Sequence, residues 1–127
     1  MSPEKKGILF VDDDPNLLEG LRRMLREKRE VWEMSFVESG SEALAVLDGS
    51  HFDVVVADYK MPGMNGFELL ERVKVAYPHI KRVLLTGQYD EEIFERSGEI
   101  VRLHLSKPCA PEDLVEELEN ILYEDIP

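Results

Sequence analysis

The chain has 127 residues, which is enough for one domain with a single hydrophobic core but short for two. Fifteen lysines and arginines against 27 acidic residues give a formal net charge of −12, which argues against sequence-independent binding to nucleic acid or to an anionic membrane. The single cysteine, Cys109, and the lack of a signal-like or membrane-spanning apolar run predict a cytoplasmic protein without an internal disulfide.

The chain begins with a strand pattern followed by a helix pattern. The continuous apolar run Ile8–Val11 predicts a strand buried on both faces. Asp14 and Pro15 then predict the N-cap and the first turn of a helix. The apolar stripe expected on this helix consists of Leu17, Leu18, Leu21, Met24 and Leu25.

The next segment predicts an edge strand and a second helix. Trp32, Met34 and Phe36 alternate with polar residues, which is typical of a half-exposed strand. We expect these three side chains to pack in the core, and a protein interface is the alternative. Ser39 and Glu42 have the spacing of a capping box for the helix that follows, and a glycine at position 49 is expected to end it.

The second half continues the alternation, with a Pro/Gly-rich loop over 61–66. The expected elements are strands at Val54–Ala57, Arg82–Leu85 and Val101–Leu105, and helices from Phe67 to about Tyr77, over Asp90–Arg96 and from Pro111 to Leu122. This order favours an α/β fold, a doubly wound parallel sheet with right-handed crossovers and helices on both faces.

Polar residues suited to phosphoryl chemistry follow four of the five expected strands. Asp12 and Asp13 follow the first strand, Asp58 the third, Thr86 the fourth and Lys107 the fifth. Because parallel strands share one carboxyl edge, these side chains are expected to meet there. Three carboxylates offer oxygen ligands to a hard cation such as Mg²⁺, while the ammonium and hydroxyl suit an anion.

Four motifs in register resemble the receiver domain of two-component response regulators. They are Val11-Asp12-Asp13-Asp14-Pro15, the run from Asp58 to Gly66, Leu85-Thr86-Gly87 and Ser106-Lys107-Pro108. The resemblance covers the chain from about Lys6 to Leu122. It implies a single receiver domain over 1–127, with 123–127 as a tail or the start of a linker. It also implies a (βα)5 flavodoxin-like sheet of five parallel strands in the order 2-1-3-4-5.

The resemblance implies a role for each strand-end residue. Asp58 would accept a phosphoryl group from a histidine kinase or phosphotransfer protein. Asp13 would bind Mg²⁺ (or Mn²⁺) directly, Asp12 would help through water, and Asp58 and the backbone carbonyl of Lys60 would complete the protein ligands. Thr86 and Lys107 would hold the phosphoryl oxygens, and the Lys107–Pro108 bond would be cis.

The resemblance also points to residues that switch or time the signal. Thr86 would move toward the phosphoryl group, and His104 occupies the position of an inward-turning Phe or Tyr. A histidine that only packs on its strand or faces solvent is the alternative. Lys60 and Gln88, two residues after Asp58 and Thr86, would tune the lifetime of the phosphoryl group.

Three functions remain open from the residues. The first is a phosphorylated signalling module with Mg²⁺, not a turnover enzyme, which controls an output domain or a partner protein. The resemblance implies that its output surface, and a possible homodimer interface, would lie on the Asp90–Arg96 helix, the fifth strand and the last helix. The second is a phosphatase with an aspartyl-phosphate intermediate, disfavoured because Tyr59 and Lys60 follow Asp58 where a second acid is wanted. The third is an interaction module that is never phosphorylated.

Overall fold

The computed structural model describes residues 5–87, 95, 98–107 and 109–123. The strands are β1 (Lys6–Val11), β2 (Trp32–Val37), β3 (Val54–Asp58), β4 (Lys81–Thr86) and β5 (Leu103–Ser106). The helices are α1 (Pro15–Met24), α2 (Gly40–Gly49), α3 (Gly66–Ala76) and α5 (Pro111–Leu122), with a 3-10 helix, η1 (Arg26–Glu30), after α1. The helix expected over Asp90–Arg96 lies outside the described residues, apart from position 95.

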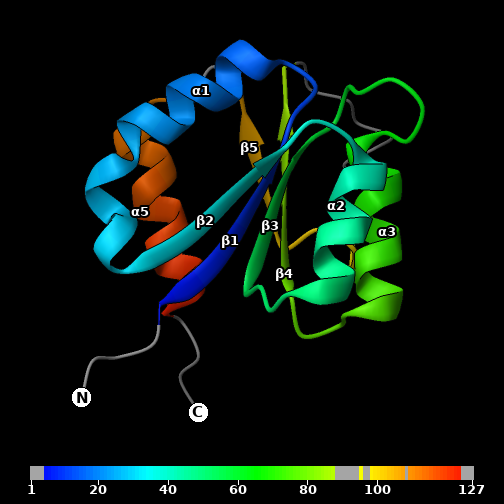
Figure 1. Ribbon diagram of the computed structural model, residues 1–127. Coiled ribbons are helices and arrows are strands. Elements are labelled where there is room, and N and C mark those ends of the chain that lie inside the picture. Colours follow the sequence, from blue (N-terminus) through cyan, green and yellow to red (C-terminus); the bar gives the residue numbers. More distant parts are fainter. Residues whose placement is uncertain (1–4, 88–94, 96–97, 108, 124–127) are drawn as a thin grey trace.

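The strands form one parallel sheet in the order β2-β1-β3-β4-β5, which confirms the expected doubly wound topology. Helices α1 and α5 cover one face of the sheet, and α2 and α3 cover the other (Figure 1). Because side chains alternate along each strand, the central strands supply both cores. Leu9 and Val55 pack beneath α2 and α3, whereas Phe10 and Val56 pack beneath α1 and α5.

Helix starts follow the sequence signals closely, with two exceptions: one predicted capping box is incomplete, and one capping box was not predicted. The Asp14 carboxylate caps α1 by accepting hydrogen bonds from the N–H groups of residues 16 and 17, as predicted. Ser39 caps α2, but the Glu42 carboxylate accepts from the N–H of Glu38 instead of closing the box on Ser39. A complete capping box joins Asn65 and Glu68 at the start of α3, where only a loop was predicted.

Several boundaries differ from the prediction by one or two residues, among them the start of the fifth strand and the end of the first helix. Strand β5 begins at Leu103 and not at Val101, although the N–H of Arg102 still donates to the carbonyl of Arg82 at 2.7 Å. Just before it, the carbonyl of Ile100 accepts a hydrogen bond from the Arg82 guanidinium at 2.6 Å. Helix α1 ends at Met24, whose side chain is 59% exposed and does not join the core. The expected core residues of β2 do pack inward: Trp32 is buried, and Met34 and Phe36 are half-buried against it.

Candidate functional site

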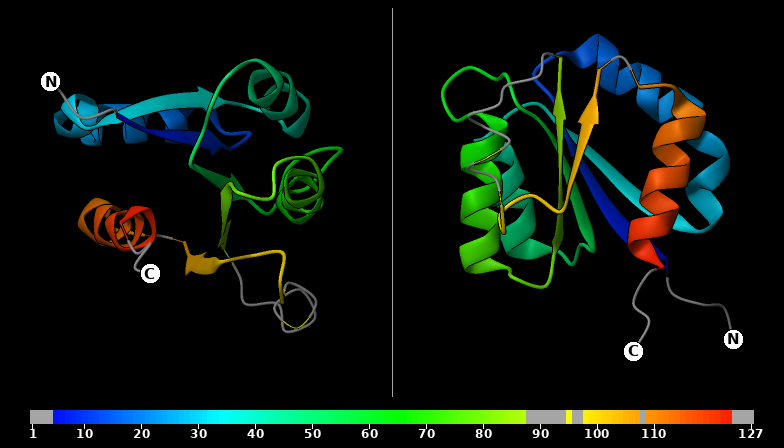
Figure 2. Two further views of the ribbon diagram at one scale, coloured as in Figure 1. Left: turned by 90° about the horizontal axis from the view of Figure 1, so that it is seen from below. Right: turned by 180° about the vertical axis from the view of Figure 1, so that it is seen from behind.

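The predicted polar residues meet at the carboxyl edge of the sheet, toward which the arrowheads of β4 and β5 point in Figure 2. Asp12 and Asp13 follow β1, Asp58 ends β3, Thr86 ends β4 and Lys107 follows β5. The parallel register brings the last residues of neighbouring strands side by side. One edge therefore gathers residues that lie up to 95 positions apart in the sequence.

Three aspartates at this edge form a cluster that fits a hard cation. A carboxylate oxygen from each of Asp12, Asp13 and Asp58 lies within 4.8 Å of the others. Asp12 and Asp58 are 3% and 5% exposed, while Asp13 is open to solvent. Buried carboxylates are costly unless they are paired or bind a cation. An all-oxygen donor set with one solvent-facing member suits Mg²⁺, which keeps several of its waters.

Lys107 joins the two buried acids. Its Nζ lies 3.0 Å from Oδ2 of Asp12 and 2.9 Å from Oδ1 of Asp58. The backbone N–H of Lys107 donates to the carbonyl of Thr86, which fixes the residue at the end of the sheet. One ammonium thus partly offsets two carboxylates, and the exposed Asp13 adds a third negative charge to the cluster.

The pKa values of this pair follow from burial and mutual charge. Burial raises the pKa of the Asp58 carboxyl above its ordinary value; the hydrogen bond from Lys107 opposes this rise, and the charges of Asp12 and Asp13 add to it. For Lys107, burial acts to lower the pKa, but hydrogen bonds to Asp58 and Asp12 and their charges outweigh it and hold the pKa above its ordinary value. The lysine therefore stays charged around neutral pH.

Backbone contacts hold the two buried acids in place. The second oxygen of Asp12, Oδ1, accepts the N–H of Asp14 at 2.9 Å, so capping and site geometry are linked. Behind Asp58, the first residue of α3 is Gly66, and a Cβ atom there would overlap the Asp58 carbonyl group. Only glycine fits this close approach. The sequence prediction placed Gly66 in the loop by its composition and did not anticipate this packing role.

Thr86 and His104 lie on the same face of the sheet. His104 pairs with Leu84 in the register between β4 and β5, and Thr86 is two residues after Leu84. Leu84 belongs to the core beneath α2 and α3. His104 is half-buried, and this burial lowers the pKa of its imidazole below the ordinary value.

The remaining predicted residues are placed only in part. Lys60 is exposed in the loop between β3 and α3. Gln88 and Pro108 lie outside the described residues, so the expected role of Gln88 and the expected cis bond at Lys107–Pro108 stay predictions.

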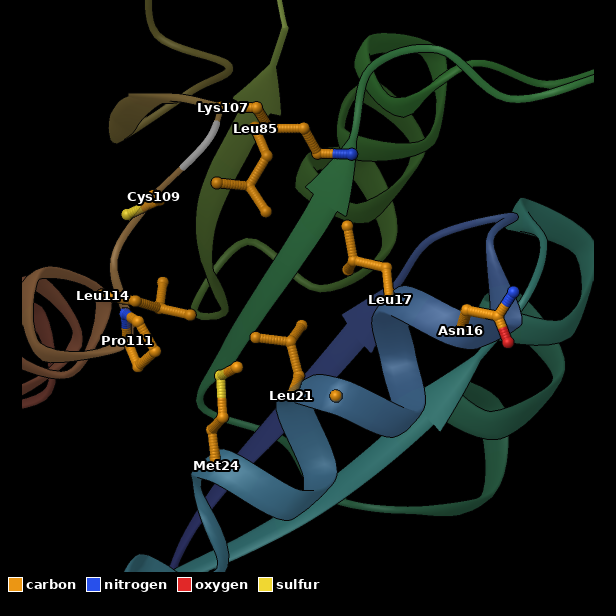
Figure 3. Close-up of a pocket in the computed structure, with 10 residues that line it drawn as sticks. Asn16, Leu17, Leu21, Met24, Leu85, Lys107, Cys109, Pro111 and Leu114 are labelled. Atoms are coloured by element: carbon orange, nitrogen blue, oxygen red, sulfur yellow. The ribbon is translucent and has the colours of Figure 1, made fainter.

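An apolar groove lies beside the site, between α1 and the start of α5 (Figure 3). It has a volume of about 540 Å³, and Leu17, Leu21 and Met24 of α1 form one wall. Leu114 lines the opposite side, and Lys107 borders the groove as well as the acid cluster. The side chains of α1 that were expected to extend the core stripe therefore line this groove. The sequence carried no signal to distinguish a core side chain of α1 from one that lines the groove.

Comparison with known proteins agrees with this geometry. The family model described as response regulator receiver domain matches residues 8–119. The chain is 33% identical over 118 residues to the hydrogenase transcriptional regulatory protein HoxA of Cupriavidus necator, covering 91% of this chain and 24% of that protein. It is also 33% identical over 104 residues to the sporulation initiation phosphotransferase F of Bacillus subtilis, covering 80% of this chain and 81% of that protein.

Solved structures give the same result. A CheY-like response regulator receiver domain protein from Methanospirillum hungatei superposes with a TM-score of 0.88 at 31% identity, covering 95% of this chain and 96% of that one. Among the described residues, no helix has the length and apolar character needed to cross a membrane. The chain spans only 22 to 32% of the length of several of its relatives that are transcriptional regulators. The receiver motifs, the sheet order and the match over residues 8–119 agree, and the chain belongs to the response regulator receiver domain family of two-component signalling.

Proposed function

We propose that Asp58 accepts a phosphoryl group from a phosphohistidine on a histidine kinase or phosphotransfer protein, and that this event switches an output domain or partner protein. One observation carries the proposal. The Asp58 carboxylate lies at the carboxyl edge of the sheet, 2.9 Å from the Lys107 ammonium and within 4.8 Å of two further carboxylates. Receiver domains in general are regulatory and bind Mg²⁺ at such an acidic pocket.

In this proposal an Asp58 oxygen attacks the phosphorus in line, the phosphorus–nitrogen bond breaks, and its electron pair leaves with the imidazole of the donor. Asp12, Asp13, Asp58 and the backbone carbonyl of Lys60 would hold Mg²⁺ (or Mn²⁺). The bound ion would neutralise charge on the transferred group. Lys107 would exchange its bonds to the acids for a bond to a phosphoryl oxygen.

The switch is proposed to begin at Thr86, whose hydroxyl would bond another phosphoryl oxygen. His104 would then turn inward on the same face of the sheet, and the surface around β5 and α5 would change its contacts with an output domain, a partner or a second copy. We place this event in the cytoplasm.

Lys60 and Gln88 would set the lifetime of the acyl phosphate by controlling access of water.

We further propose that the donor protein covers the groove beside Lys107. Its phosphohistidine has to reach Asp58, and the groove shares Lys107 with the site. Met24 leaves apolar surface exposed at the groove, as expected for a surface that a partner covers. Met24→Lys is expected to slow phosphorylation by a purified phosphorylated donor protein but not by acetyl phosphate. Val75→Lys, at an exposed apolar residue of α3, is the matched control. Equal effects with both donors would remove the groove from this role.

Intact mass spectrometry after incubation with Mg²⁺ and acetyl phosphate tests the central proposal. We expect a single phosphoryl adduct that is lost on Mg²⁺ chelation and in Asp58→Asn. Asp48→Asn, on the exposed end of α2, should keep the adduct. No adduct in the wild-type protein would support an interaction module. Continuous release of phosphate from a phosphomonoester would support a phosphatase.

A further inference from the structure

A second group of metal-ligating side chains lies at the opposite edge of the sheet. His51 and Asp53 precede β3, and His79 precedes β4. His51 Nε2 lies 3.4 Å from Oδ1 of Asp53, and the rings of His51 and His79 are stacked with centroids 6.1 Å apart and planes 9° from parallel. Two of the three histidines in the chain therefore stand together beside a carboxylate.

Backbone hydrogen bonds fix the carboxylate of this group. Oδ2 of Asp53 accepts the N–H of Gly7 at 2.8 Å, which leaves Oδ1 facing His51. The N–H of Asp53 donates to the carbonyl of Gly7, and the N–H of Lys81 donates to the carbonyl of Asp53. His79 is only two residues before Lys81. The segment that carries His51 and Asp53 is therefore bonded to the start of β1 and, directly, to the start of β4 two residues after His79.

We propose that His51, Asp53 and His79 form a binding site for a divalent transition metal ion of the Zn²⁺ type. Two ligands about 2.0–2.1 Å from a tetrahedral ion lie about 3.4 Å apart, which matches the His51–Asp53 separation of 3.4 Å. Imidazole nitrogens favour Zn²⁺ over Mg²⁺, and a hydrogen-bonded carboxylate is the kind of supported ligand that metal sites use. Among the described residues only Asp12, Asp13 and Asp58 bring three ligand atoms within 4.8 Å of one another, so the exposed His79 ring would have to turn from its stacked position on His51 to supply the third ligand. Water would supply the fourth.

This site is separate from the acid cluster at the carboxyl edge. Asp53 precedes β3 and Asp58 ends it, so the two sites are about 16 Å apart along the strand. A bound ion would join the α2–β3 and α3–β4 connections and stabilise the folded state over the unfolded chain. The proposal does not depend on phosphorylation of Asp58.

Proton NMR of the imidazole groups tests the site directly, with untagged protein titrated with Zn²⁺ in excess Mg²⁺. We expect the His51 and His79 signals to shift together and saturate at one ion per chain, while the His104 signal stays unchanged as an internal control. His51→Gln and His79→Gln should each weaken binding by about tenfold or more. Zn²⁺ should raise the Tm of the wild-type protein and not that of the double variant.

Several outcomes would overturn the proposal. If His79→Gln binds Zn²⁺ as tightly as the wild type, the ion does not bridge the two histidines, and the His51–Asp53 contact is an ordinary surface pair. Equal shifts of all three histidines would indicate non-specific binding. A Tm increase that survives in the double variant would place the stabilising ion elsewhere.

Discussion

Replacing Asp13 with asparagine removes the exposed carboxylate of the acid cluster and keeps the size of the side chain. We expect two opposite effects. The metal-free protein should become more stable, because Asp13 repels the carboxylates of Asp12 and Asp58. If Mg²⁺ binds here as proposed, the stabilisation that it gives to the folded state should fall, because the proposed direct ligand is lost.

The size of the first effect follows from the distances. Two like charges 4.8 Å apart interact by about 0.9 kcal/mol in water, so repulsion from Asp12 and Asp58 sums to about 1.7 kcal/mol. The attraction of Lys107 offsets part of this sum, which leaves about 1 kcal/mol, or about 4 °C in Tm. In the wild type, Mg²⁺ at ten times its Kd should add about 1.4 kcal/mol.

Urea unfolding in chelator and in Mg²⁺, at low and high salt, measures both effects. The matched control is Asp14→Asn, which removes the same charge one residue away and keeps a good N-cap. This control should retain the Mg²⁺ stabilisation, and the gain in Asp13→Asn should shrink in high salt. If Asp13→Asn is less stable than the wild type in chelator, or gains as much stability from Mg²⁺, the electrostatic account of the cluster is wrong.

Three further predictions rest on single contacts. Gly66→Ala should lower the free energy of unfolding by about 2 kcal/mol or more, because the added Cβ meets the Asp58 backbone. Gly20→Ala, whose Cβ would have open space around it, should raise the free energy of unfolding by about 0.5–1 kcal/mol in the same urea assay. Because burial lowers the pKa of His104, the imidazole binds a proton more tightly in the unfolded chain than in the folded protein. The free energy of unfolding should therefore fall as the pH drops below the ordinary imidazole pKa of about 6.5, and it should fall less in His104→Gln. Urea titrations between about pH 7.5 and about pH 5.5 measure both. Burial, with the nearby acids of α5, raises the pKa of the Cys109 thiol, so a maleimide or disulfide reagent should label Cys109 more slowly at neutral pH than it labels free cysteine.

The sequence predicted the acid cluster and its lysine because parallel register brings four strand ends with polar residues to one edge. Asp12, Asp58 and Lys107 needed no knowledge of loops, since each lies at or next to the end of a strand. Features that depend on side-chain competition were not predicted. The bond from the Arg82 guanidinium to the Ile100 carbonyl is one such feature, and the Glu42 carboxylate, which accepts the N–H of Glu38 and not that of Ser39, is another.

The missed capping box at Asn65 did have a signal. Asn65 is followed three residues later by Glu68, but the surrounding Pro and Gly residues indicated a loop and masked it. The groove beside α1 had no signal, because Leu21 and Met24 fit a core stripe as well as a groove wall. Helical periodicity shows which side chains share a face, and only the packing of α5 shows how much of that face is covered.

The charge balance at the carboxyl edge suggests an order of events. Asp12, Asp13 and Asp58 with Lys107 carry a net charge of −2 when all four are ionised, and a divalent cation would neutralise it. Before a cation binds, the Lys107 ammonium is shared by two buried acids and is not available to an incoming phosphoryl group. A cation that takes over those carboxylate oxygens would release Lys107 toward the phosphoryl group. We therefore expect the metal to bind first. If the wild-type protein were phosphorylated by acetyl phosphate at the same rate in Mg²⁺ and in chelator, this order would be wrong.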